Sequence, residues 1–97
     1  MNIGVCQIHL DLPSSRSLKD KRKVLRSLTG WVPSRFSVAI AEVDCNDSWK
    51  AAMLGVCCVS NDPVHANKML SKVVQYVISC RVDALIRDYE TEIISGI

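Results

Sequence analysis

Hydrophobic and polar residues alternate from Asn2 to Leu12, which predicts a strand with one buried face. The apolar side of this strand carries Cys6, Ile8, Leu10 and Leu12. The opposite side carries polar residues. We therefore expect the strand to lie in a sheet that is covered on one face.

After this strand the apolar residues recur at helical spacing, and a helix is predicted to begin near Leu18 with Ser17 as its N-cap. Gly30 and Pro33 are expected to mark the frayed end of this helix. Lys21 falls inside the apolar sector and is expected to extend along its edge to solvent. The face expected to pack on the sheet consists of Leu18, Val24, Leu25, Leu28, Trp31 and Val32.

A hairpin is predicted next. Residues Phe36 to Asp44 form a strand rich in β-branched and small residues, Cys45 to Ser48 form a polar turn, and Trp49 to Ser60 form the second strand. Asp62 and Pro63 are typical of a helix start, and this second helix is expected to end near Arg81. A last strand is predicted from Ala84 to Ile94.

The element order is therefore βαββαβ. With right-handed crossovers, this order gives a four-stranded antiparallel sheet with both helices on one face. The sequence predicts an α+β, ferredoxin-like fold of split βαβ type, and residues 1–97 are expected to form a single domain.

The segment from Ala51 to Val59 is apolar in both phases of a strand, which calls for cover on both faces of the sheet. We expect Ala52, Leu54 and Val56 to lie on the face without helices, where a homodimer or another partner would cover them. The alternative is a short exposed apolar patch at the centre of the sheet.

The composition limits the classes of protein. No apolar stretch reaches the length of a membrane span, and the N-terminus reads directly as a strand and not as a signal peptide, so a cytoplasmic protein without membrane contact is expected. The five cysteines are odd in number and include no C-x-x-C pair. We expect no metal site and no cofactor.

Positive charge is concentrated between Arg16 and Arg35, which hold seven of the 12 basic residues with Asp20 as the only acid. On a helical projection the cations of the predicted first helix other than Lys21 occupy one solvent sector. We name the following set the basic stripe: Arg16, Lys19, Arg22, Lys23 and Arg26.

The basic stripe could neutralise several phosphates of structured RNA or of a ribosomal particle. The alternative is an ordinary solvated helix face, which the net charge of only +2 favours. A base-stacking sheet of the RNA-recognition type is not expected, because the open-face positions of the first strand are Val5, Gln7 and His9. Any RNA contact should therefore involve the helix and the phosphates.

Catalytic chemistry has little support in the sequence. His9 and His65 have no serine or cysteine partner in a recognisable motif, so no catalytic residue is assigned. The segment before Arg16 contains no glycine with which to cradle phosphate, unlike the acylphosphatases of similar topology. A small phosphate-handling enzyme built on Arg16 and the turn at Asn46 and Asp47 remains a minor alternative.

Several segments together resemble the YlxP-like family of small bacterial proteins of unknown function. They are Gly4 to Cys6, Ser17 to Arg22 with the sequence SLKDKR, Val38 with Ala41 to Asp44, and Gly55 to Val56 with Val59 to Asp62. The resemblance implies a ferredoxin-like fold. The genomic neighbours of such proteins suggest a role with RNA or the ribosome, and the family supplies no catalytic residues. The leading hypothesis is a non-enzymatic accessory factor that binds RNA; a dimeric module that binds a protein or small ligand on the open sheet face is the alternative.

Overall fold

The computed structural model describes residues 1–97 and contains four strands and two helices. They are, in chain order, β1 (Asn2–Asp11), α1 (Leu18–Arg35), β2 (Ala39–Asp44), β3 (Ala51–Ser60), α2 (Pro63–Ser79) and β4 (Leu85–Ile94). The strands form one antiparallel sheet in the order β2-β3-β1-β4. This arrangement confirms the predicted α+β, ferredoxin-like fold.

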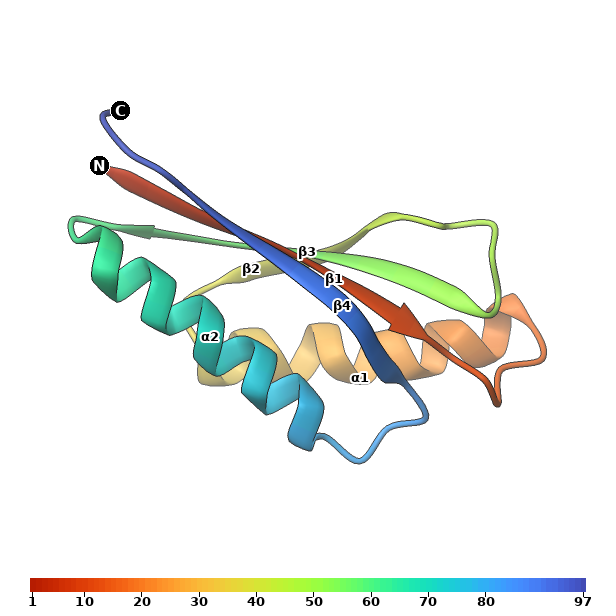
Figure 1. Cartoon of the computed structure of the whole chain (residues 1–97). Coiled ribbons are helices and arrows are strands. Elements are labelled where there is room, and N and C mark those ends of the chain that lie inside the picture. The colour runs from red at the N-terminus through yellow and green to blue at the C-terminus, as the bar shows by residue number, and fades with distance from the viewer.

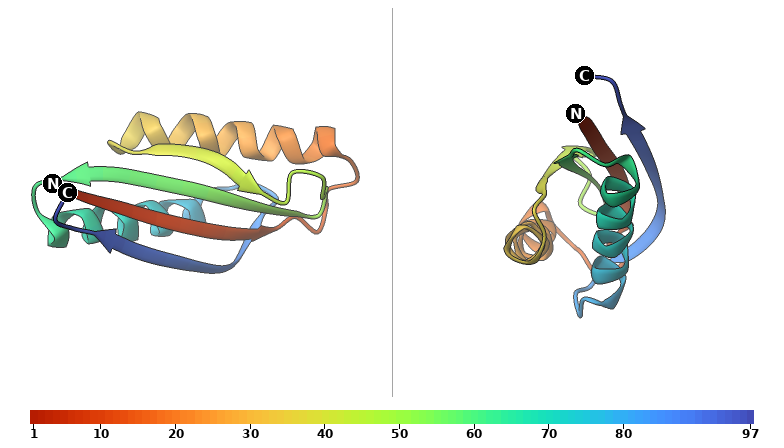
Figure 2. Two further views of the ribbon diagram at one scale, coloured as in Figure 1. Left: turned by 90° about the horizontal axis from the view of Figure 1, so that it is seen from above. Right: turned by 90° about the vertical axis from the view of Figure 1, so that its left-hand side faces the viewer.

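Both helices lie on the same face of the sheet, as Figure 1 shows, and the opposite face carries no helix (Figure 2). The two termini lie together at one end of the sheet, where the Met1 ammonium donates to the Ile97 carbonyl at 3.1 Å. The segment between β1 and α1 and the loop between β2 and β3 lie at the other end (Figure 1). The fold thus separates an open sheet face from a helical face that bears the basic stripe.

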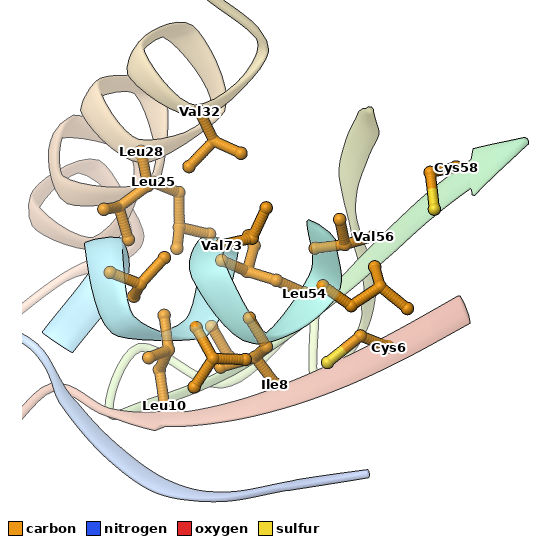
Figure 3. Packing of buried hydrophobic residues seen from close by; sticks show 14 of the residues in the cluster. Cys6, Ile8, Leu10, Leu25, Leu28, Val32, Leu54, Val56, Cys58 and Val73 are labelled. Atoms are coloured by element: carbon orange, nitrogen blue, oxygen red, sulfur yellow. The ribbon is translucent and has the colours of Figure 1, made fainter. Parts of the chain in front are cut away.

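The core fills the space between the helices and the two central strands (Figure 3). Strand β1 contributes Cys6, Ile8 and Leu10, and Leu12, which follows the strand directly, is also buried, as the alternation predicts. The helices contribute buried residues at helical spacing: Leu25, Leu28 and Val32 from α1, and Ala66, Leu70, Val73, Val74 and Val77 from α2.

Ala52, Leu54 and Val56 lie in this core, so their predicted place on the open face is wrong. The register pairs them with Leu10, Ile8 and Cys6 of β1. Residues that face each other on adjacent strands point to the same side of a sheet, and β1 directs this side to the helices. The open face of β3 is consequently formed by the other phase of the strand: Ala51, Met53, Gly55, Cys57 and Val59.

Helix α1 continues through Pro33 to Arg35, two residues beyond the proline at which its end was expected. A proline removes one donor from the helix, and the ladder resumes beyond it because the Phe36 amide donates to the Val32 carbonyl at 3.0 Å. Burial of Val32 holds this last turn against the core. Trp31, expected on the packing face, is 41% exposed.

Helix α2 begins as predicted, with the Asp62 carboxylate accepting a hydrogen bond from the Val64 amide at 2.9 Å. It passes close to β1 at Gly4, where an added Cβ would lie 2.9 Å from Leu70 Cδ1 and 3.0 Å from Cys58 Sγ. Gly4 thus permits the close approach of helix and strand. Neither helix has the length and apolar character needed to cross a membrane.

Candidate nucleic-acid interface

The start of α1 is fixed by reciprocal hydrogen bonds. The Asp20 amide donates to the Ser17 hydroxyl at 3.1 Å, which confirms Ser17 as the N-cap. In return, Asp20 Oδ2 accepts a hydrogen bond from the Arg16 amide at 2.9 Å. Asp20 therefore holds the backbone of Arg16 beside the first turn, and Arg16 joins the helix cations in one region of the surface.

All five residues of the basic stripe are exposed. The four that lie within α1, Lys19, Arg22, Lys23 and Arg26, occupy the side of the helix opposite the buried residues. The chain has two ion pairs within 4.0 Å, His9 with Asp88 and Lys21 with Glu42, and neither includes a residue of the stripe. The stripe is thus an uncompensated positive surface at the N-terminal half of α1.

Lys21 does not reach solvent, and the expectation that it would do so is wrong. It is 1% exposed, and its Nζ lies 2.8 Å from Glu42 Oε2 on β2. The ammonium also donates to the carbonyls of Cys45 at 2.8 Å and Ala51 at 3.3 Å, with Asn46 O at 3.5 Å. A buried lysine is tolerable here because its charge is paired and its protons have acceptors.

Glu42 lies on the edge strand β2 and pairs with the Lys21 ammonium. We call this ion pair, together with the Lys21 hydrogen bonds to the loop carbonyls, the Lys21 anchor. The Glu42 side chain is 20% exposed, and no donor other than the Lys21 ammonium lies near its buried Oε2. Two features of the sequence are consistent with a buried ion pair: a lysine inside an apolar helix sector, and a glutamate in phase with the half-buried Ile40. Their pairing depends on a tertiary contact and could not be read from either segment alone.

The Lys21 anchor holds the loop between β2 and β3 (residues 45–50) against α1. A second tie joins the end of this loop to the segment before α1: Lys50 Nζ donates to the Pro13 carbonyl at 2.8 Å, and the Leu12 amide donates to the Lys50 carbonyl at 2.8 Å. The loop also presents Trp49, which is 46% exposed. The loop that carries Trp49 and Lys50 therefore lies at the same end of the molecule as the start of α1 (Figure 1).

The polar turn considered for an enzyme lies in this loop. Asn46 and Asp47 are exposed, and the Asn46 carbonyl faces the Lys21 ammonium. None of the four surface hollows includes Arg16, Asn46 or Asp47. The largest, of about 640 Å³, lies at the opposite end of α1 beside Phe36 and Val59. The geometry thus adds nothing in favour of the enzyme hypothesis.

The open face of the sheet is mainly apolar over β2, β3 and the adjoining Val5 of β1. Small residues produce a hollow of about 380 Å³ between Val5 and Val43, above Gly55 and beside Ala41. Gly55 is required there, because an added Cβ would lie 2.7 Å from Val43 Cγ1. An apolar open face is expected because both phases of β3 are apolar. The structure has such a face, but the other phase of β3 forms it, and not Ala52, Leu54 and Val56.

The margin of the open face is acidic. Strand β4 places Asp88, Glu90 and Glu92 opposite His9, Gln7 and Val5 of β1. His9 Nε2 lies 3.8 Å from Asp88 Oδ1. No group of three or more histidine, cysteine, aspartate or glutamate side chains is arranged to hold a metal ion. The negative margin and the positive stripe therefore lie on different surfaces of the molecule.

Comparison with known proteins agrees with the fold and with the sequence resemblance. The model of the family described as "Protein of unknown function (DUF503)" matches residues 3–91. The chain is also 31% identical over 77 residues to the uncharacterised protein YlxP of Bacillus subtilis, a match that covers 79% of this chain and 84% of that relative. The region matched by the family model includes the SLKDKR segment, and the two comparisons together confirm the resemblance to YlxP-like proteins. The chain therefore belongs to the DUF503 family.

Proposed function

We propose that this protein is a non-enzymatic factor that binds structured RNA, such as the RNA of a ribosomal particle, through the basic stripe. The observation that carries the proposal is the set of five exposed cations, none of whose charged side-chain groups forms an ion pair within 4.0 Å. Free cations on one surface bind the phosphate backbone by releasing its counterions. Lys21, whose charge is neutralised internally, takes no part in this binding.

The distribution of charge supports RNA binding more strongly than the net charge of +2 does. The basic stripe lies on the solvent side of α1, whereas three acidic side chains, Asp88, Glu90 and Glu92, gather on the open face along β4. An anion that approaches α1 meets a row of cations, and the charge there is more positive than the net charge of the whole molecule indicates. Local potential, and not net charge, governs such an approach.

Charge-matched variants test the proposal. In the first variant, Lys19, Arg22, Lys23 and Arg26 are changed to glutamine. In the control variant, four exposed cations elsewhere are changed to glutamine, namely Lys68, Lys72, Arg81 and Arg87. Both variants lose four positive charges, so they differ only in where the charges are removed.

The stripe variant should bind a structured RNA, or co-sediment with ribosomal particles, at least about tenfold more weakly than the control variant at low salt. Each phosphate contact that is lost should also reduce the slope of log affinity against log salt concentration by about 0.7 to 0.9. Equal affinity and equal salt slopes for the two variants would refute the proposal.

We propose a second function for the open sheet face, namely association with another copy of the chain. The observation in its favour is the continuous apolar surface formed by Val5, Val43, Gly55 and Cys57, with Val59 at 67% exposure. Apolar faces of this kind are stabilised by burial against another apolar surface. Sedimentation of the wild-type protein as a monomer at high micromolar concentration would contradict this second proposal.

A further inference from the structure

The basic stripe alone would not distinguish paired from unpaired RNA, because phosphate contacts carry no information about the bases. The loop between β2 and β3, which lies at the end of the molecule where α1 begins (Figure 1), carries an exposed aromatic side chain, Trp49. This residue lies in the loop at 45–50, which the Lys21 ammonium fastens to α1. The Lys21 and Pro13 contacts therefore fix this loop at the end of the molecule where α1 begins.

Trp49 has a cation beside it. The Lys50 ammonium lies over the indole ring, 5.8 Å from its centroid, and donates one hydrogen bond to the Pro13 carbonyl. An ammonium has three donors, so two remain available to a phosphate. An exposed indole next to a positively charged side chain is the combination with which proteins bind single-stranded nucleic acid.

The other exposed tryptophan offers a contrast. Trp31 lies on α1 itself, but on a helical projection it lies roughly 130° around the helix from the middle of the basic stripe. It also lies in the C-terminal half of the helix, beyond the last stripe residue, Arg26. The two tryptophans are similarly exposed, at 41% and 46%, but only Trp49 belongs to the loop at the end of the molecule where α1 begins (Figure 1).

We propose that Trp49 stacks on an unpaired base of an RNA whose backbone contacts the basic stripe. This inference rests on the proposed RNA binding and specifies its ligand: RNA with a single-stranded loop, bulge or end, in preference to a continuous duplex. The stripe from Lys19 to Arg26 covers about 10 Å of helix axis and binds phosphates. Trp49 provides a flat surface for a base, and Lys50 a contact for the adjoining phosphate.

Stacking on an aromatic side chain tolerates all bases, because each base has a π face. The structure therefore assigns selectivity for unpaired RNA without selectivity for a particular sequence. A base within a duplex is already stacked on its neighbours and cannot be splayed onto the indole without unpairing. A blunt duplex should accordingly contact the stripe alone.

Fluorescence provides a direct test, because the chain has two tryptophans. In the variant Trp31→Phe, Trp49 is the only indole. Two probes are titrated: an RNA hairpin with a single-stranded loop, and a blunt RNA duplex with the sequence of the hairpin stem. The hairpin should quench the fluorescence of Trp49, whereas the duplex should leave it nearly unchanged.

Affinity provides the second measurement. Trp49→Ala should weaken binding of the hairpin by about tenfold and leave binding of the duplex within about twofold of wild type. Trp49→Phe, which keeps an aromatic ring, should retain most of the hairpin affinity. Trp31→Ala is the matched control and should bind both RNAs as the wild type does.

The two proposals fail in different ways. If Trp49→Ala binds the hairpin as tightly as wild type while the stripe variant does not, RNA binding stands and the role of Trp49 is refuted. If Trp49 is quenched equally by hairpin and duplex, the preference for unpaired bases is refuted. If wild type binds neither RNA, both proposals are wrong.

Discussion

Lys21 of α1 and Glu42 of β2 form an ion pair inside the fold, with 2.8 Å between Nζ and Oε2. The ammonium is almost wholly buried and also serves carbonyls of the loop between β2 and β3. A single side chain thus joins a helix, an edge strand and a loop. Its neighbours Arg22 and Lys23 face solvent, so adjacent cations of one helix have different structural roles.

Lys21→Met should lower the free energy of unfolding by about 3 kcal/mol, because Glu42 and the loop carbonyls lose their cation while remaining partly buried. Urea unfolding measures this change. The matched control is Lys19→Met on the exposed side of the same helix, which should change stability by no more than about 0.5 kcal/mol. Similar values for the two variants would show that the ion pair does not hold the loop.

Replacing both partners should be less costly than replacing one. In the double variant Lys21→Met with Glu42→Leu, no charge is left without its partner, so stability should recover much of the loss. The coupling energy between the two side chains follows from the free energies of unfolding of the wild type, Lys21→Met, Glu42→Leu and the double variant. A double variant less stable than Lys21→Met would contradict this account.

Two glycines should respond in opposite directions to the same change. Gly4→Ala would place a methyl group 2.9 Å from Leu70 Cδ1 and 3.0 Å from Cys58 Sγ, so these buried side chains or α2 must shift, at a cost of about 1 to 3 kcal/mol. Gly30→Ala meets nothing within 4 Å inside α1 and should stabilise the protein by about 0.5 to 1 kcal/mol. Thermal unfolding of both variants tests the pair, and stabilisation by Gly4→Ala would refute the close approach.

The cysteines should differ in reactivity. Burial raises the pKa of the Cys6 and Cys58 thiols above their ordinary value of 9.0, while hydrogen bonds from Thr91 and the Gly4 backbone act weakly in the opposite direction. A raised pKa lowers the thiolate fraction at neutral pH. Iodoacetamide followed by mass spectrometry should therefore label the exposed Cys57 first, and Cys6 and Cys58 last. Equal labelling rates for Cys6 and Cys57 would contradict the packing of β1 against the helices.

The same two thiols give a pH dependence with a definite sign. Because their folded pKa values are raised, the unfolded chain loses these protons at a lower pH than the folded protein does. Their contribution to stability is therefore complete below the unfolded pKa of about 9 and is lost as the pH rises through the folded values. Denaturant midpoints measured from neutral pH upward should fall less in a Cys6→Ala, Cys58→Ala variant than in the wild type.

Association through the open face can be tested at Val59, which is 67% exposed on β3. Val59→Lys should shift sedimentation towards the monomer, because a charge would be buried in the proposed interface. Val64→Lys is the matched control, since Val64 is 60% exposed on α2, away from that face. Equal sedimentation of wild type and Val59→Lys would remove the open face as an interface.

The order of elements and the core face of β1 could be predicted because their hydrophobic periods are unambiguous. The core face of β3 could not be chosen from its own sequence, since both phases from Ala51 to Val59 are apolar. Only the register with β1, in which Leu54 faces Ile8, selects the phase that the helices cover. A strand with two apolar faces needs its neighbour before its orientation can be assigned.

The basic stripe could be predicted because charge and helical spacing are local properties. The Lys21 anchor could not, because its acceptors come from Glu42 and from backbone carbonyls more than 20 residues away in the chain. The position of the loop that carries Trp49 depends on the same contact. Residues whose roles come from tertiary neighbours are thus the ones that periodicity leaves unresolved.

The Lys21 anchor has one more consequence, for the thermodynamics of recognition. The loop that carries Trp49 and the helix that carries the basic stripe are already held at a fixed spacing before any ligand arrives. A ligand that contacts both surfaces would lose little free energy in ordering the protein, so preorganisation would be retained as affinity. The lysine that is hidden from solvent would then strengthen binding without touching what is bound.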